Sequence, residues 1–201
     1  MKTRSILCLG DSYTIGEGVP LHESFPYQLV QLLRADNHLF NAPEIVAKTG
    51  WTTFELINHL NHIKLNQQYN FITLLIGVNN QYRELSTVDF KNDFEVLLKQ
   101  AIDFANKITK NVIVVSIPNW GLTPFAKDKN SVQITSEIDT FNGVCEMMAQ
   151  KYQTKFVNIT AETSVAKNDV SLLTTDQLHY SGKEHLIWAE KIFNAIKKEL
   201  I

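Results

Sequence analysis

Short apolar runs alternate with longer amphipathic segments along the whole chain. The runs are rich in β-branched residues, which favour strands, whereas the longer segments carry apolar residues at helical spacing. The clearest run, at residues 72–76, reads Ile-Thr-Leu-Leu-Ile and is nearly all apolar, as expected for a strand that helices cover on both faces. We therefore predict parallel strands at Ser5–Leu9, Ile45–Ala47, Phe71–Ile76, Val112–Ile117 and Lys155–Ile159.

Four helices are predicted between and after these strands. In the clearest one, apolar residues recur every three or four positions from Phe90 to Ile108, and its start carries a capping-box-like serine and aspartate. A second pattern runs from Ile134 to Met148. The three predicted helix starts are the pairs Ser86 with Asp89, Thr52 with Glu55, and Ser181 with Glu184, the last opening a helix towards Leu200.

The strict alternation of strands and helices predicts a three-layer α/β/α fold. Because crossovers between parallel strands are right-handed, we expect a five-stranded sheet in the flavodoxin-like order 2-1-3-4-5. We find no linker or repeat and predict a single domain over residues 1–201. In such sheets ligands bind beyond the carboxyl ends of the strands, beside the point where the strand order reverses. The segments after the first three strands should therefore meet the segment before the last helix.

Composition narrows the kinds of partner. The chain of 201 residues is 44% apolar and 20% charged, with a formal net charge of -2. This balance gives no broad basic surface for nucleic acid or an anionic membrane. No apolar stretch reaches the ~20 residues of a transmembrane helix. The early run Ile6–Leu9 is too short for a signal peptide, so we expect a cytoplasmic protein without a transmembrane segment.

A hydroxyl near one end of the chain and an Asp-His pair near the other end should meet in the predicted fold. Ser12 follows the first strand among small residues, where it can act as a nucleophile or simply cap a helix. Asp176 precedes His179 by three residues, so its carboxylate can accept the Nδ1 hydrogen and orient the imidazole as a base towards serine.

Acyl transfer also needs hydrogen-bond donors for the oxyanion that develops on the carbonyl oxygen. Gly50 follows the second strand and can offer an open N–H, and Asn79 follows the third strand and offers a side-chain amide. Each has an alternative interpretation, because Gly50 can be a turn glycine and Asn79 can form an Asx-turn. The ordered set is what favours the catalytic interpretation.

These segments resemble the four sequence blocks of the SGNH hydrolases, also called the GDSL esterase/lipase family. The matching blocks are Ile6–Tyr13, Ala47–Trp51, Leu75–Asn80 and Asp176–His179. The resemblance implies a serine esterase without cofactor or metal. Ser12 would be the nucleophile, Asp176 and His179 the base pair, and Ser12, Gly50 and Asn79 the oxyanion donors. Tyr13 and Asn80 depart from the leucine and aspartate of the commonest patterns, which weakens any inference about substrate class.

The substrate is expected to be a small-molecule acyl ester. The segment 118–125 after the fourth strand is rich in apolar groups and turn formers, so it can line a pocket or fold back on the core. Arg83 can meet a carboxylate, phosphate or sugar hydroxyl, or form a surface salt bridge. His59 and His62 lack a third ligand at zinc-like spacing and predict no metal site. Our candidates for substrate binding are Asp11, Tyr82, Arg83, Trp120, Leu122 and Phe125.

Two other functions fit parts of this pattern. A non-catalytic flavodoxin-like module would bind phosphate or a nucleotide with the N–H groups after the first strand, including those around Ser12, Gly16 and Gly18. That hypothesis leaves the other three blocks unexplained. An acyltransferase would use the same acyl-serine intermediate and pass the acyl group to an alcohol instead of water. We predict a hydrolase of acyl esters of small alcohols, sugars or lysophospholipids.

Overall fold

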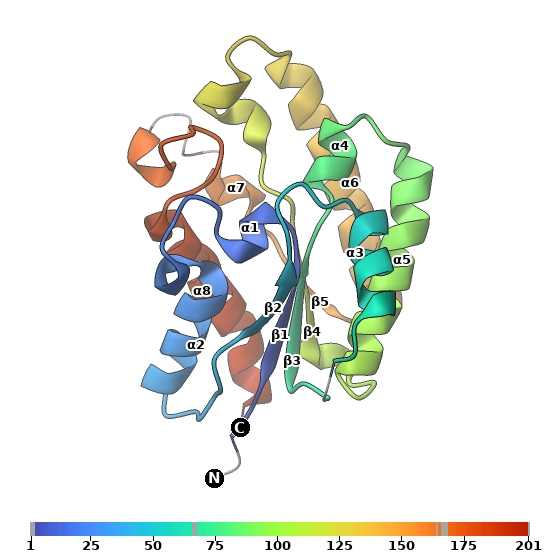
Figure 1. The fold of residues 1–201 in the computed structure, drawn as a ribbon, viewed down its shortest axis with the longest axis vertical. Coiled ribbons are helices and arrows are strands. Elements are labelled where there is room, and N and C mark those ends of the chain that lie inside the picture. The colour runs from blue at the N-terminus through green and yellow to red at the C-terminus, as the bar shows by residue number, and fades with distance from the viewer. Residues whose placement is uncertain (1–2, 66–67, 164, 166–168, 201) are drawn as a thin grey trace.

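The computed structural model describes residues 3–65, 68–163, 165 and 169–200. Within these residues the strands form a five-stranded parallel sheet in the order β2-β1-β3-β4-β5 (Figure 1). The predicted α/β class and strand order are confirmed. The strands are β1 (Ile6–Gly10), β2 (Glu44–Ala47), β3 (Phe71–Leu75), β4 (Val112–Val115) and β5 (Lys155–Val157).

Helices cover both faces of the sheet, as Figure 1 shows. α2 (Phe25–Ala35) and α8 (Gly182–Ile196) pack together on one face. α3 (Thr53–His62), α5 (Thr87–Phe104) and α6 (Ser131–Tyr152) cover the other. The shorter helices are α1 (Ser12–Ile15), α4 (Val78–Tyr82) and α7 (Thr160–Thr163), with 3-10 turns at Leu21–Glu23, Thr109–Asn111, Trp120–Leu122, Pro124–Ala126, Val170–Leu172 and Lys197–Glu199.

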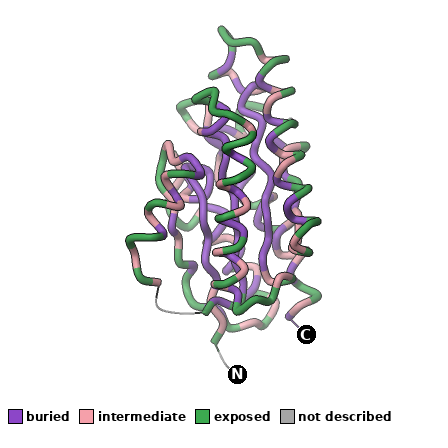
Figure 2. Tube along the Cα trace, turned by 90° about the vertical axis from the view of Figure 1, so that its right-hand side faces the viewer, coloured by how far each residue is buried: buried purple, intermediate pink, exposed green. Residues whose placement is uncertain are grey.

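The apolar core fills the space between the sheet and its two helical layers. Every residue of β1, β3 and β4 is buried, and Figure 2 shows buried chain along the strands and exposed chain on the outer helix faces. Fully burying one such side chain stabilises the fold by roughly 1.5–3 kcal/mol relative to leaving it exposed. This rigid sheet fixes the strand ends from which the site is built.

All three predicted helix starts are confirmed, but the expected side-chain cap is present at only two of them. Thr52 and Glu55 form a full capping box at α3, and Ser86 accepts from two backbone N–H groups of α5. Ser181 is the N-cap of α8, but its side chain makes no cap hydrogen bond. The capping box predicted there is wrong, because the Ser181 N–H already donates to the carbonyl of Leu172 at 2.7 Å. Glu184 turns inward instead and accepts from Trp188 Nε1 at 2.9 Å.

The remaining differences concern element boundaries. α5 ends at Phe104, four residues before the predicted end, because Asn106 and Lys107 take left-handed backbone conformations with φ of 55° and 62°. β4 and β5 end two residues earlier than predicted. The sequence reasoning missed α2, although its buried residues Phe25, Leu29 and Leu33 follow helical spacing.

Candidate active site

Ser12 begins the one-turn helix α1 directly beyond the end of β1. A side chain at Gly10 would lie 2.3 Å from the Leu75 carbonyl oxygen, so the turn from strand into helix requires glycine there. Asp11 is the N-cap of α1, and its side chain accepts the Tyr13 N–H at 3.0 Å. Ser12 is 5% exposed and lines a cavity at this edge of the sheet.

His179 and Asp176 form a close pair on the loop before α8. His179 Nδ1 lies 2.6 Å from Asp176 Oδ2. The other carboxylate oxygen accepts the N–H groups of Leu178 and His179 at 2.8 and 2.9 Å and the Thr174 hydroxyl at 2.8 Å. Burial alone would raise the pKa of Asp176, but these hydrogen bonds, led by that of the His179 side chain, hold it well below its usual range. The carboxylate is therefore ionised and fixes the imidazole.

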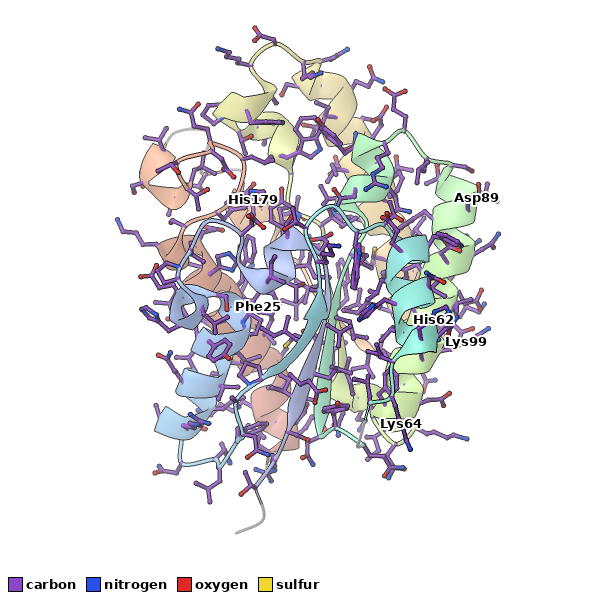
Figure 3. The ribbon with its side chains drawn as sticks, viewed as in Figure 1. Phe25, His62, Lys64, Asp89, Lys99 and His179 are labelled. Atoms are coloured by element: carbon purple, nitrogen blue, oxygen red, sulfur yellow. The ribbon has the colours of Figure 1, made fainter. Side chains whose placement is uncertain are left out.

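The imidazole of His179 faces the same cavity as Ser12 and lies beside α1 in Figure 3. The Tyr13 ring packs edge-on against it, with ring centroids 5.6 Å apart. Among the described residues, Ser12 Oγ makes no hydrogen bond, either to His179 or to another group. Such contacts are often long before a substrate binds and tighten in the complex.

Gly50 and Asn79 reach the cavity from the ends of β2 and β3, and each is held in place by a hydrogen bond. Gly50 has a φ of 83°, and its carbonyl oxygen accepts from Arg83 Nη2 at 2.6 Å. Asn79 Nδ2 donates to the Trp51 carbonyl at 3.0 Å. Since an amide NH₂ has two hydrogens, this bond orients the side chain and leaves one hydrogen for a ligand.

The cavity has a volume of about 200 Å³ and an apolar, aromatic wall. Tyr82 and Phe125 both pack on Trp120, with ring centroids 5.3 and 6.1 Å away. Trp120 Nε1 donates to Gln81 Oε1 at 2.7 Å, which fixes the indole. The sequence reasoning named these three rings but missed Tyr13, Thr49, Val78 and Leu178, which also line the cavity.

Three predicted substrate-binding residues do not line this cavity. Asp11 is fully buried and holds α1, so direct contact with substrate does not fit the structure. Burial raises the pKa of Asp11 to about 7, although hydrogen bonds from the Tyr13 and Gly77 N–H groups lower it. Arg83 pairs with Glu55 at 3.3 Å and with the Gly50 carbonyl, as in the salt-bridge alternative. Leu122 lies outside the residues that form the cavity wall.

The structure also accounts for Asn80, where the commonest family pattern has aspartate. Asn80 Oδ1 accepts the Thr53 N–H at 3.0 Å, and its Nδ2 donates to the Thr53 hydroxyl at 2.8 Å. Asn80 therefore fastens the start of α3 to the end of β3 and supports the segment that carries Gly50.

The phosphate-binding alternative meets an obstacle at α1. The Asp11 carboxyl already accepts an N–H group that a phosphate would need there.

Across the described ranges, no cluster of three or more histidine, cysteine, aspartate or glutamate side chains can hold a metal ion. His59 packs on Trp51 with ring centroids 4.8 Å apart, and His62 lies exposed at the end of α3 (Figure 3). In the same described portion, no helix is long and apolar enough to cross a membrane.

Comparisons with known proteins find one matching family model and several solved structures of the same fold. The model of the GDSL-like lipase/acylhydrolase family matches residues 8–185. No curated protein sequence matches the chain significantly. A lipase/acylhydrolase from Enterococcus faecalis is similar in structure, with a TM-score of 0.78 and 18% identity over 99% of this chain and 98% of that one.

Two esterases of known structure share the same fold. The acetylxylan esterase Axe2 from Geobacillus stearothermophilus has a TM-score of 0.76 and 16% identity, over 96% of this chain and 94% of that one. The psychrotrophic esterase EstA from Pseudoalteromonas sp. has a TM-score of 0.75 and 16% identity, over 98% of each chain.

Proposed function

The chain belongs to the GDSL-like lipase/acylhydrolase family, and from that premise we propose that its carboxylic-ester hydrolysis runs through an acyl intermediate on Ser12. The observation that carries the proposal is the Asp176–His179 pair, 2.6 Å apart, at the cavity that Ser12 lines. A carboxylate in this position holds the imidazole in the tautomer whose Nε2 can accept a proton.

In the proposed reaction His179 Nε2 takes the proton of the Ser12 hydroxyl while Oγ attacks the ester carbonyl carbon. The N–H groups of Ser12 and Gly50 and the Asn79 amide donate to the oxyanion that forms. Collapse of this intermediate breaks the bond to the alcohol oxygen, which takes the proton from His179. Water then attacks the acyl-serine by the same route, releasing the carboxylic acid and restoring the Ser12 hydroxyl.

The cavity supports a short acyl group. Its volume of about 200 Å³ lies below the range of ~300–1,000 Å³ typical of drug-sized ligands. Val78, Leu178 and the Tyr82, Trp120 and Phe125 rings give it an apolar lining, which suits the methyl end of an acetyl to butyryl chain. We therefore propose a short-chain esterase.

The test is hydrolysis of p-nitrophenyl esters from acetate to palmitate by the wild type and by Ser12→Ala. We expect the highest kcat/KM between acetate and butyrate, and a loss of roughly 10³-fold or more in Ser12→Ala. Ser136→Ala, which removes an exposed hydroxyl from α6, is the matched control. Acid quenching followed by mass analysis should find the acyl group on the peptide that contains Ser12. Undiminished turnover in Ser12→Ala would refute the nucleophile.

The acceptor of the acyl group is a separate question. Adding methanol or glycerol to the assay and measuring ester and free acid products distinguishes transfer from hydrolysis, because both acceptors compete for the same acyl-serine. For a hydrolase, free acid should remain the main product.

A further inference from the structure

A second cavity of about 300 Å³ lies beside the catalytic cavity and shares the Tyr82 and Trp120 side chains with it. It lies between the end of α4 and the start of α6. Unlike the first cavity, it is mainly polar, and its polar lining includes Gln81, Glu84, Lys129, Gln133 and Glu137.

The polar groups of the second cavity are held by one another. Glu137 Oε2 accepts from Gln81 Nε2 at 2.7 Å, and Glu137 Oε1 accepts from Gln133 Nε2 at 2.8 Å. Gln81 also accepts the Trp120 indole N–H at 2.7 Å. The network therefore extends from the second cavity to the wall of the catalytic cavity and orients both.

We propose that this second cavity binds the alcohol portion of the ester and that this portion is uncharged and rich in hydroxyls, as in a sugar. The inference rests on the proposed function, since an ester carbonyl held at Ser12 has two branches. The apolar cavity suits the acyl branch, and the polar cavity across Tyr82 and Trp120 suits the other.

The chemistry of the lining selects an uncharged alcohol. Amides, carboxylates and an ammonium offer both donors and acceptors, which match a hydroxyl because it donates and accepts. Glu84 and Glu137 bring two negative charges against the single positive charge of Lys129, so a phosphate headgroup is disfavoured. Lys129 itself opposes a cationic alcohol, and it forms no ion pair within the described part of the chain. The half-exposed Tyr82 ring offers an apolar face for sugar C–H groups.

The experiment compares two acetyl esters that differ in the alcohol, a monoacetylated methyl glucoside and p-nitrophenyl acetate. The double variant Lys129→Ala/Gln133→Ala should lower the ratio of kcat/KM for the glucoside to that for p-nitrophenyl acetate about tenfold, the size expected for two lost hydrogen bonds. Both residues are exposed, so the variant should fold. The matched control is Lys127→Ala/Gln150→Ala, whose side chains are exposed and lie outside the cavity lining, and it should keep the wild-type ratio.

The outcomes separate the two proposals. An unchanged ratio in the double variant, with wild-type enzyme active on p-nitrophenyl acetate, would overturn the alcohol site and leave the esterase intact. Acetylcholine or acetylated glycerol phosphate as a better wild-type substrate than the glucoside ester would overturn the uncharged alcohol. If the wild type hydrolyses neither acetyl ester, the proposed function itself fails.

Discussion

His179 owes its orientation to one carboxylate that is held at both oxygens. Asp176 binds the imidazole with one oxygen and two backbone N–H groups with the other, so the carboxylate cannot rotate away without breaking the loop. Asparagine at this position would keep the size of the side chain but present an NH₂ group or a weaker acceptor to the imidazole. The geometry would survive and the tautomer would not.

We therefore predict that Asp176→Asn lowers kcat/KM by roughly 10³- to 10⁴-fold, the cost seen when a triad aspartate is replaced. The measurement is p-nitrophenyl acetate hydrolysis at pH 7 to 8, with folding checked by circular dichroism. Asp128→Asn, which changes an exposed loop carboxylate, is the control. Activity within a few-fold of wild type would show that Asp176 does not position the base.

Substitution of the neighbours Asn79 and Asn80 should affect different properties, activity for Asn79 and stability for Asn80. Asn79→Ala removes a proposed oxyanion donor, so kcat should fall by ~10²- to 10³-fold while KM changes little. Asn80→Ala breaks two buried hydrogen bonds to Thr53, so it should reduce the free energy of unfolding by roughly 1–3 kcal/mol. Steady-state kinetics and urea unfolding on both variants test this. A pure KM effect in Asn79→Ala would move Asn79 from the oxyanion site to substrate binding.

At the scale of elements, the starts of α3 and α8 form a natural matched pair. Thr52 accepts a backbone N–H of α3 and completes a capping box, whereas the Ser181 side chain makes no such bond at α8. We predict that Thr52→Ala lowers the free energy of unfolding by ~1 kcal/mol, which at this chain length corresponds to a Tm lower by roughly 2–4 °C.

Ser181→Ala is the control for that prediction and should change stability by less than about 0.5 kcal/mol. Differential scanning calorimetry gives both values under one set of conditions. A loss in Ser181→Ala equal to that in Thr52→Ala would mean that the hydroxyl of Ser181 stabilises α8 by an interaction other than a cap.

The same pair shows what a sequence can and cannot predict. Hydrophobic periodicity reports burial, so it identified the strands and the long helices other than α2. Their alternation and the handedness of crossovers then predicted the strand order. In this fold Ser12 and His179 line one cavity at the edge of the sheet. A capping box read from spacing requires a free N–H at the cap. At Ser181 the backbone N–H donates to the Leu172 carbonyl, which lies outside the motif.

Side-chain contacts between separate elements also could not be predicted from the sequence. The bond from Asn79 to Trp51 and the contact of Arg83 with the Gly50 carbonyl depend on side-chain rotamers across two loops. No spacing rule predicts them. The places of Leu178 and Tyr13 in the cavity wall could have been predicted, because each is adjacent in sequence to a predicted catalytic residue.

For the whole molecule, two buried ionisable groups make stability depend on pH in opposite directions. Burial raises the pKa of Asp11 to about 7 from 3.8, so the folded protein keeps a proton that the unfolded chain has lost. The contribution of Asp11 to the free energy of unfolding is present below about pH 4 and is lost as pH rises to about 7. Burial, with a smaller contribution from His179, lowers the pKa of His185 to about 3 from 6.5. That contribution is present above about pH 6.5 and is lost as pH falls.

Two substitutions should separate these effects in urea unfolding between pH 4 and pH 8. Asp11→Asn keeps an acceptor for the Tyr13 N–H but no proton to lose. Its stability relative to wild type should therefore rise by about 1.4 kcal/mol for each pH unit between about pH 4 and pH 7. His185→Gln can still accept the Phe25 N–H, which His185 Nδ1 accepts at 3.2 Å. Its stability relative to wild type should rise by a similar amount as pH falls from about 6.5. Because the two slopes have opposite signs, a general weakening of the core cannot produce both, and difference curves that stay flat with pH would refute the assignment.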